Sequence, residues 1–197
     1  MYVPGTILMW LAFVAGIAST ITYGLSIRHA EKWRSPARQA YVLMTAAIVL
    51  ASIILMYLLV THDYRLHYVW AYSDNMLPLH YLLSTFWAGQ EGSFLLWVFL
   101  GAWLGLFLIY QSGRQEPRVM LVYNLNNLFL MILLIKQSPF HMSAVAPADG
   151  NGMNMLLQDP WMAIHPPIVF LGYAAYAIPF AFAINALWSR DYDGWIK

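Results

Sequence analysis

Residues 92–110 read GSFLLWVFLGAWLGLFLIY and contain no charged side chain. A helix of about 20 apolar residues is long enough to cross the hydrocarbon core of a membrane. This stretch, about Gly92–Tyr110, is therefore predicted to be a transmembrane helix. Four further stretches meet the same criterion: about Thr6–Ile27, Ala40–Val60, Val119–Ile135 and Pro166–Trp188. The sequence thus predicts an all-α polytopic membrane protein with about five transmembrane helices, which form a single membrane domain over residues 1–197.

The composition of the whole chain supports this fold class. Of its 197 residues, 61% are hydrophobic and 10% are charged, whereas soluble domains are about 25% charged. The net charge is +1 and no basic block is present, which disfavours nucleic-acid binding. The lack of cysteine excludes disulfides, thiolate metal sites and cysteine nucleophiles. The first span follows no basic segment and its apolar run is too long for a signal peptide.

The positions of the cations predict the orientation. Eight of the ten Lys and Arg residues flank one side of the predicted spans: Arg28, Lys32, Arg34, Arg38, Arg114, Arg118, Arg190 and Lys197. Cytoplasmic loops of membrane proteins carry such an excess of cations. The N-terminus is therefore predicted outside and the C-terminus in the cytoplasm. Two long external loops follow, about Thr61–Glu91 and Lys136–His165, with aromatic side chains expected at the headgroup level.

Histidines gather on the predicted external side. His62, His67, His80, His141 and His165 lie there, and His29 lies in a cytoplasmic loop. His165 precedes two prolines, which fit the first turn of a helix, so it is expected at the mouth of the last span in an extended conformation. The helix dipole there favours a neutral imidazole, the form that ligates metals. His165 is therefore a candidate haem or metal ligand; helix capping or headgroup contact is the alternative.

A second cluster of candidates leads into the span at residue 92. Trp87 and Glu91 are four residues apart and would share one face of a helix, with Gln90 and Trp97 on a neighbouring face. Two intervening glycines would let a backbone or a flat ligand approach closely. Tryptophan beside a carboxamide suits a large planar apolar ligand, and it equally suits an aromatic belt at the membrane surface. Glu91 is also explained by the helix dipole alone, with Ser93 as a possible cap.

Other functions find less support. The methionines of the second loop could bind copper, but no cysteine and no regular Met-x-x-Met spacing accompany them. No phosphate-binding loop, dinucleotide fingerprint or Ser-His-Asp order is present. Half of a transporter is one alternative, for which Pro179 is the sole hint, since the predicted span interiors carry no charge. A structural subunit of a respiratory or assembly complex is the other.

Taken together and in this order, the motifs resemble the CcmF family of cytochrome c haem lyases and the related nitrite-reductase haem lyase subunit. The resemblance rests on Leu77-Pro78, Trp87–Trp97, Pro139-Phe140, Leu156–Pro160, His165–Pro167, Gly172-Tyr173 and Phe180–Ala183. The chain departs from the family pattern at Ser138, Asn151-Gly152 and Met155. It resembles the N-terminal third of the family and lacks the tryptophan-rich segment that follows.

The resemblance implies a set of site residues. His165 is similar to the first external axial ligand of the haem iron, and the second ligand would come from a partner chain or a continuation of this one. The implied haem or chaperone surface comprises Trp87, Gln90, Glu91, Trp97, Pro166 and Pro167. The implied supporting loop comprises Gln158, Asp159 and Pro160.

The resemblance also implies a reaction and a setting. The chaperone CcmE would deliver haem, b-type in transit, and the assembled lyase would hold it while apocytochrome c thiols form thioethers with its vinyl groups. The implied partners are the remaining haem lyase segment or subunit, holo-CcmE, a CcmH-type thiol oxidoreductase and apocytochrome c. The chain is not expected to be active alone. The implied location is the bacterial or mitochondrial inner membrane, with the functional loops on the periplasmic or intermembrane side.

Overall fold

A computed structural model describes residues 1–143 and 147–192. Five helices are long and apolar enough to cross a membrane: α1 (Val3–Ser26), α2 (Ala30–Val60), α5 (Gln90–Gln111), α6 (Glu116–Lys136, preceded by the 3-10 turn η2, Gly113–Gln115) and α7 (Pro160–Ser189). The shorter elements are α3 (His67–Tyr72), α4 (Leu79–Ser84), η1 (Thr85–Trp87) and η3 (Met155–Leu157). The prediction of an all-α chain with five membrane-spanning helices is confirmed.

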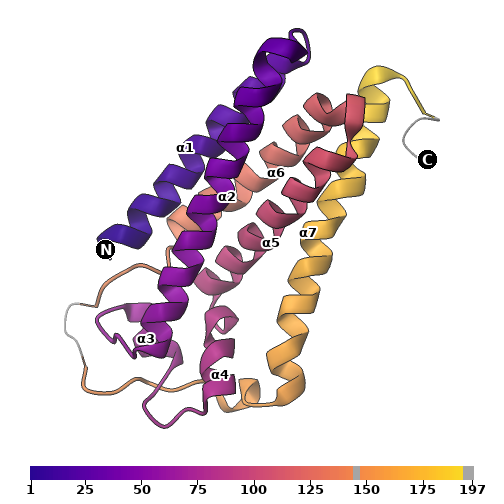
Figure 1. The fold of residues 1–197 in the computed structure, drawn as a ribbon. Helices are drawn as coiled ribbons and strands as arrows, with labels where there is room; N and C mark the ends of the chain where they lie inside the picture. Colours follow the sequence, from indigo (N-terminus) through magenta and orange to yellow (C-terminus); the bar gives the residue numbers. More distant parts are fainter. Residues whose placement is uncertain (144–146, 193–197) are drawn as a thin grey trace.

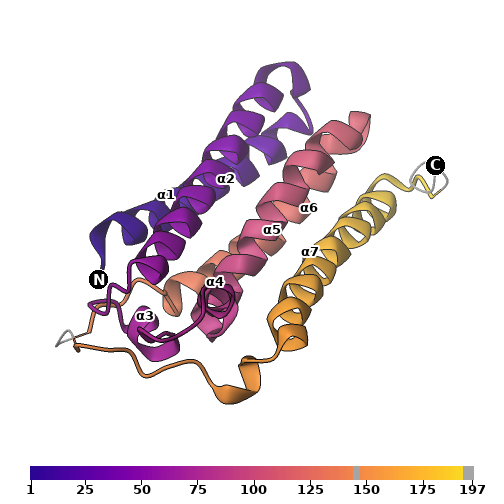
Figure 2. The same ribbon diagram turned by 60° about the horizontal axis from the view of Figure 1, so that its bottom comes forward.

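The long helices run side by side, and the start of α1 and the end of α7 lie at opposite ends of the bundle (Figure 1). α1 packs along α2, while α6 packs against α1, α5 and α7. The end that holds α3, α4, residues 137–143 and residues 147–159 is called the loop end here. The end where α1 turns into α2, α5 turns into α6 and α7 stops is called the cationic end. Figure 2 shows α7 along one edge of the bundle.

Two helices begin well before their predicted starts. α2 begins at Ala30 instead of about Ala40, so Arg34 and Arg38 belong to a helix and not to a loop. α7 begins at Pro160 instead of Pro166. Hydropathy locates the apolar part of a helix, but it misses turns that extend into polar surroundings. Both predicted boundaries were therefore wrong, and the α7 boundary changes the geometry of His165.

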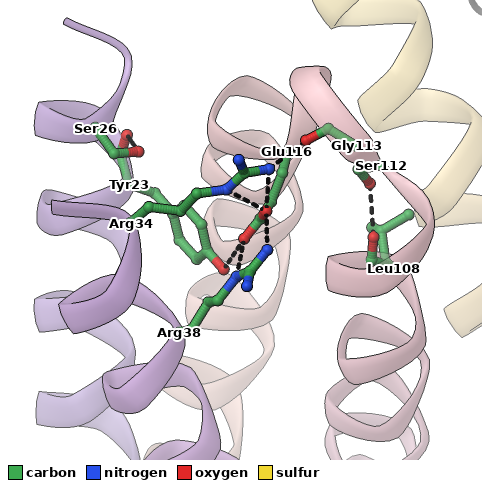
Figure 3. Close-up of polar contacts among 8 residues, drawn as sticks. All are labelled: Tyr23, Ser26, Arg34, Arg38, Leu108, Ser112, Gly113 and Glu116. Atoms are coloured by element: carbon green, nitrogen blue, oxygen red, sulfur yellow. Dashed lines mark hydrogen bonds and ion pairs between the residues drawn. The ribbon is translucent and has the colours of Figure 1, made fainter. Parts of the chain in front are cut away.

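A buried carboxylate ties three helices together at the cationic end (Figure 3). Glu116, the first residue of α6, is 0% exposed. Arg38 of α2 donates from Nε to Oε1 at 2.7 Å and from Nη2 to Oε2 at 2.6 Å. Arg34 donates from Nε to Oε2 at 2.6 Å, and the Tyr23 hydroxyl of α1 donates to Oε1 at 3.1 Å. Four donors thus converge on one carboxylate and fix α1, α2 and α6 relative to one another.

A second polar contact crosses the same helices nearer the middle of the bundle. The Asn124 amide Nδ2 donates to the Ser19 hydroxyl at 3.0 Å, and both side chains are buried. Polar side chains in a membrane span are stabilised when a neighbouring helix supplies the partner. This contact and the Glu116 cluster hold α6 against α1 at two depths.

Replacing Glu116 tests this arrangement. Glu116→Gln removes the charge and leaves two guanidinium groups facing each other, each about a third or more exposed (34% for Arg34 and 43% for Arg38). Loss of a buried charged partner costs more than loss of a surface pair, so we expect a destabilisation of about 2 kcal/mol. The readout is the thermal unfolding midpoint of the purified protein. The control is Glu31→Gln, an exposed acid in the first turn of α2; equal shifts for both variants would contradict the prediction.

The orientation stays a prediction that a fusion can test. A reporter that is active only in the cytoplasm, joined after Lys197, should be active, because the cations gather at the end where α7 stops. A periplasm-specific reporter at the same position should be inactive. The reverse pattern would overturn the predicted orientation.

Candidate functional site

His165 lies inside a helix and not ahead of one. The Asp159 carboxylate caps α7 by accepting hydrogen bonds from the backbone N–H groups of Trp161 at 2.9 Å and Met162 at 3.3 Å. Pro160 then occupies the first helical position, where a backbone N–H would have no partner within the helix, so the proline costs no hydrogen bond. The prediction that His165 adopts an extended backbone at the helix mouth was wrong. The cap at Asp159 starts the helix early enough to include the residue before the proline pair.

His165 opens onto the outer surface of α7. It lines an open groove of about 370 Å³ with Trp161, Met162, Ile164 and Ile168. Trp161 is 79% exposed, and the other four residues are exposed as well. Trp161 and Ile168 stand four residues before and three residues after His165, so they share its face of the helix. The groove, called the His165 groove below, offers one imidazole beside a wall of apolar side chains.

The opposite side of α7 is fixed by Trp87. Pro166 and Pro167 have no backbone N–H, so neither can bond to the carbonyl of Ala163, three and four residues earlier. The Trp87 indole Nε1 donates to this carbonyl at 3.1 Å. The side chain from η1 therefore supplies the donor that the two prolines remove. One contact therefore joins α7 to the segment before α5. It depends on Trp87 and on the proline pair, Pro166 and Pro167.

Trp97 extends this contact by two turns. Its ring lies against Phe170 and Tyr173 of α7, with centroid distances of 5.9 Å and 5.5 Å. Its Nε1 is buried without a hydrogen-bond partner among the residues that the structure describes. Trp87 and Trp97 therefore both contact the inner side of α7, while His165 lies on the exposed side. Their predicted part in a haem or chaperone surface stays a prediction.

Gln90 and Glu91 are the first two residues of α5. The helical conformation is interrupted just before them, at Gly89. Trp87 belongs to η1, and Gly89 is the N-cap of α5, so the predicted shared helix face of Trp87 and Glu91 was wrong. Gln90 is exposed and Glu91 is half-buried. Burial, and secondarily the Glu91 charge, raises the pKa of Tyr72 in α3. Glu91 therefore acts electrostatically on α3, which packs beside it.

The two glycines in this segment make room for tyrosines of the same chain. A Cβ on Gly89 would collide with the rings of Tyr72 and Tyr68, and one on Gly92 would collide with Tyr68 and a backbone carbonyl. The Tyr68 hydroxyl donates to the Phe86 carbonyl at 3.0 Å and accepts from the Gly89 N–H at 3.1 Å. The space beside the glycines, predicted to admit a flat ligand or a backbone, is thus filled by tyrosine side chains of α3. Ser93 is not the predicted cap, because its hydroxyl donates to the Trp87 carbonyl at 2.9 Å.

The supporting loop is held from two sides. The Gln158 side chain donates from Nε2 to the Met153 carbonyl at 3.0 Å, and the backbone carbonyl of Gln158 accepts from the Tyr81 hydroxyl at 2.8 Å. Backbone hydrogen bonds from Asn75 and Gly150 lower the pKa of Asp149, which joins the two long loops. The carboxylate form therefore stabilises the loop contact at neutral pH, and that contribution is lost as the pH falls through the lowered pKa.

The other loop-end histidines do not converge on His165. The rings of His62, His67 and His80 each lie against an aromatic ring one to three residues away, at 5.9, 5.5 and 4.2 Å. The His141 carbonyl accepts from the His67 N–H at 2.9 Å. Within residues 1–143 and 147–192, no three His, Cys, Asp or Glu side chains gather as a metal site. The described chain therefore offers a single imidazole on the His165 groove.

The sequence reasoning missed most of the groove's other lining residues. Trp161 and Ile164 were not singled out, because the helix was expected to begin after them, at Pro166. Ile168 lies inside the predicted span, where its apolar side chain gave no signal of a groove. Asp159 followed by proline is a signal for a helix N-cap and first position. A helix that starts at this signal places Trp161 and Ile168 on the same face as His165.

Comparison with known proteins gives a consistent picture. A family profile described as "Cytochrome C assembly protein" matches residues 87–193. The chain is 39% identical over 163 residues to "Cytochrome c-type biogenesis protein CcmF" of Pseudomonas fluorescens, which covers 79% of this chain and 24% of that protein. It is 32% identical to "Cytochrome c-type biogenesis protein NrfE" of Haemophilus influenzae, over 78% of this chain and 26% of the relative.

A solved structure titled "Cytochrome c Heme Lyase CcmF" superposes with a TM-score of 0.77 at 25% identity. The match covers 98% of this chain and 31% of that one. The chain thus spans about a quarter of the length of the two curated relatives and under a third of the solved one.

The joint between Trp87 and the proline pair is testable by rescue. Trp87→Phe keeps an aromatic ring but leaves the Ala163 carbonyl without a donor, so we expect a loss of about 1 kcal/mol in stability. Adding Pro167→Ala restores an N–H four residues after Ala163 and should recover most of that loss. Thermal unfolding of the two single variants and the double variant measures the coupling. Strictly additive effects would show that the indole and the prolines are independent.

Proposed function

The chain belongs to the cytochrome c assembly protein family, and on that premise we propose that it forms the N-terminal part of a haem lyase. In this proposal it helps to position haem at the loop end of the bundle for covalent attachment to apocytochrome c. The observation that carries the proposal is the His165 groove, in which one exposed imidazole lies among exposed apolar side chains.

The chemistry of the groove suits haem as a substrate. Haem is planar and largely apolar, and its iron takes a neutral imidazole as an axial ligand. His165 would supply that ligand, and Trp161 and Ile168 would contact the macrocycle from the same helix face. Because the described residues offer one such imidazole in the groove, the second axial ligand would come from a continuation of the chain or from a partner subunit.

The proposed role is positioning. Each thioether forms when a cysteine S–H of apocytochrome c adds across a haem vinyl group, so the sulfur bonds to carbon and the proton completes the adduct. The thiols belong to the apocytochrome, and the chain itself contains no cysteine. Holding the two reactants in a fixed geometry accelerates such a reaction without any protein nucleophile.

The remaining site residues take supporting roles in the proposal. Trp87 and Trp97 hold the inner side of α7, and Pro166 and Pro167 create the free carbonyl that Trp87 binds. Gln158, Asp159 and Pro160 set the start of α7. Gln90 and Glu91 remain candidates for the surface that meets haem or its chaperone. These roles add to the ligand role of His165 and do not replace it.

The setting of the proposed reaction follows from the orientation. The loop end would face the periplasm of a bacterium or the intermembrane space of a mitochondrion. CcmE would deliver the haem there, a CcmH-type oxidoreductase would keep the apocytochrome thiols reduced, and the rest of the lyase would complete the site.

The decisive variant is His165→Ala in the complete lyase, co-expressed with its partners. Loss of the axial ligand should change the haem absorption spectrum of the purified complex and lower the yield of holocytochrome c at least tenfold. His80→Ala is the matched control, because His80 is an exposed histidine at the same end and outside the His165 groove. It should leave the spectrum and the yield unchanged.

Two outcomes would count against the proposal. An unchanged haem spectrum and yield in His165→Ala would exclude His165 as a ligand and favour a structural subunit. A loss in His80→Ala as large as that in His165→Ala would show that the effect is not specific to the groove. Added imidazole should partly restore the spectrum of His165→Ala if the missing group is the ligand itself.

A further inference from the structure

A second groove lies at the cationic end, away from the candidate site. It has a volume of about 460 Å³ and is lined by residues from the end of α1 and the turn after it, from α6 and from α7: Gly24, Leu25, Ile27, Arg28, His29, Leu121 and Trp188. α1 and α7 both pack against α6. The groove therefore lies over α6, with the two outer helices as its walls. None of its lining residues is acidic.

Beyond the groove, an exposed apolar stripe follows Leu121 along α6. Leu125, Phe129 and Ile132 follow Leu121 at spacings of four, four and three residues, so they lie on the same side of the helix. All three are exposed. The groove thus has a polar mouth at Arg28, and an apolar stripe leads from it along α6, away from the cationic end. This combination matches a molecule with a charged head and a long apolar tail.

The charge at the mouth lacks a partner within the described part of the chain. Arg34 and Arg38 are both engaged by Glu116. Arg28 is exposed, and residues 1–143 and 147–192 provide it with no ion pair. Arg118 lies three residues before Leu121, so α6 places a second cation near the same mouth. Trp188, on the opposite wall, is 54% exposed and belongs to a residue type that favours the headgroup level.

We propose that this groove binds an anionic phospholipid, with its phosphate at Arg28 and one acyl chain along Leu121 and Leu125. Basic pockets between transmembrane helices on the cytoplasmic side bind anionic headgroups. Arg28, to which the described residues give no ion pair, supplies the charge complementarity, and the exposed stripe on α6 supplies the surface for the acyl chain. The site is independent of the proposed haem lyase function and lies at the other end of the bundle.

The test compares phosphatidylglycerol with phosphatidylcholine on the purified full-length protein by native mass spectrometry. The protein should prefer phosphatidylglycerol by about fivefold, the factor associated with one cation near an anionic surface. Arg28→Gln should abolish this preference. Lys32→Gln is the matched control, because Lys32 is an exposed cation at the same end but does not line the groove. It should retain the preference.

A second variant separates the groove from general charge attraction. Leu121→Trp fills the floor and leaves every charge in place, so it should weaken the binding of both lipids. Inorganic phosphate at the same concentration should not displace phosphatidylglycerol, since it lacks the acyl chain. His165→Ala should leave lipid binding unchanged, which keeps this test apart from the test of haem binding.

Three results would overturn the proposal. Equal losses in Arg28→Gln and Lys32→Gln would indicate non-specific attraction. Displacement by inorganic phosphate would indicate a simple anion site. Absence of lipid binding, with no effect of Leu121→Trp, would indicate that another protein segment fills the groove in the full-length chain.

Discussion

The bundle depends on one buried carboxylate. Glu116 accepts hydrogen bonds from Arg34, Arg38 and Tyr23, which belong to two other helices. A charge is stable away from water only when its partners are in place. The contact therefore requires α1, α2 and α6 to meet at one point at the cationic end. Because α5 and α7 also pack on α6, that helix connects the Glu116 contact to the other side of the bundle.

At the loop end, aromatic side chains, backbone groups and the Asp159 carboxylate hold the elements together. Tyr68 occupies the space beside Gly92, Trp87 binds the Ala163 carbonyl, and Asp159 starts α7. The Trp87 and Asp159 contacts fix the first two turns of α7, and the Tyr68 contact holds α3 against the start of α5. The exposed side, with His165, remains available. The same turns thus combine a rigid inner attachment with an open outer surface, which suits a site that is completed by another segment.

Composition and hydropathy predicted the five long helices, because each needs a long uncharged run and the loops between them collect the cations. The same approach missed the first turns of α2 and α7. Arg34 and Arg38 resemble loop residues in a hydropathy profile, and their partner Glu116 is 82 and 78 residues away in the sequence. His165 was found from its motif, but its groove was not, because the groove depends on a helix start that Asp159 sets. Contacts of this kind depend on how several helices are placed relative to one another. Local sequence patterns do not contain that information.

The hydrogen bond from Trp87 to Ala163 has a consequence for biosynthesis. Its donor precedes its acceptor by 76 residues. A chain made from its N-terminus therefore contains the indole, and the whole of α5 and α6, before the proline pair leaves the ribosome. The stretch of α7 in which two successive prolines remove backbone hydrogen bonds then forms after the Trp87 side chain that binds it has been synthesised. The order of translation thus makes the Trp87 donor before the Ala163 carbonyl that accepts from it.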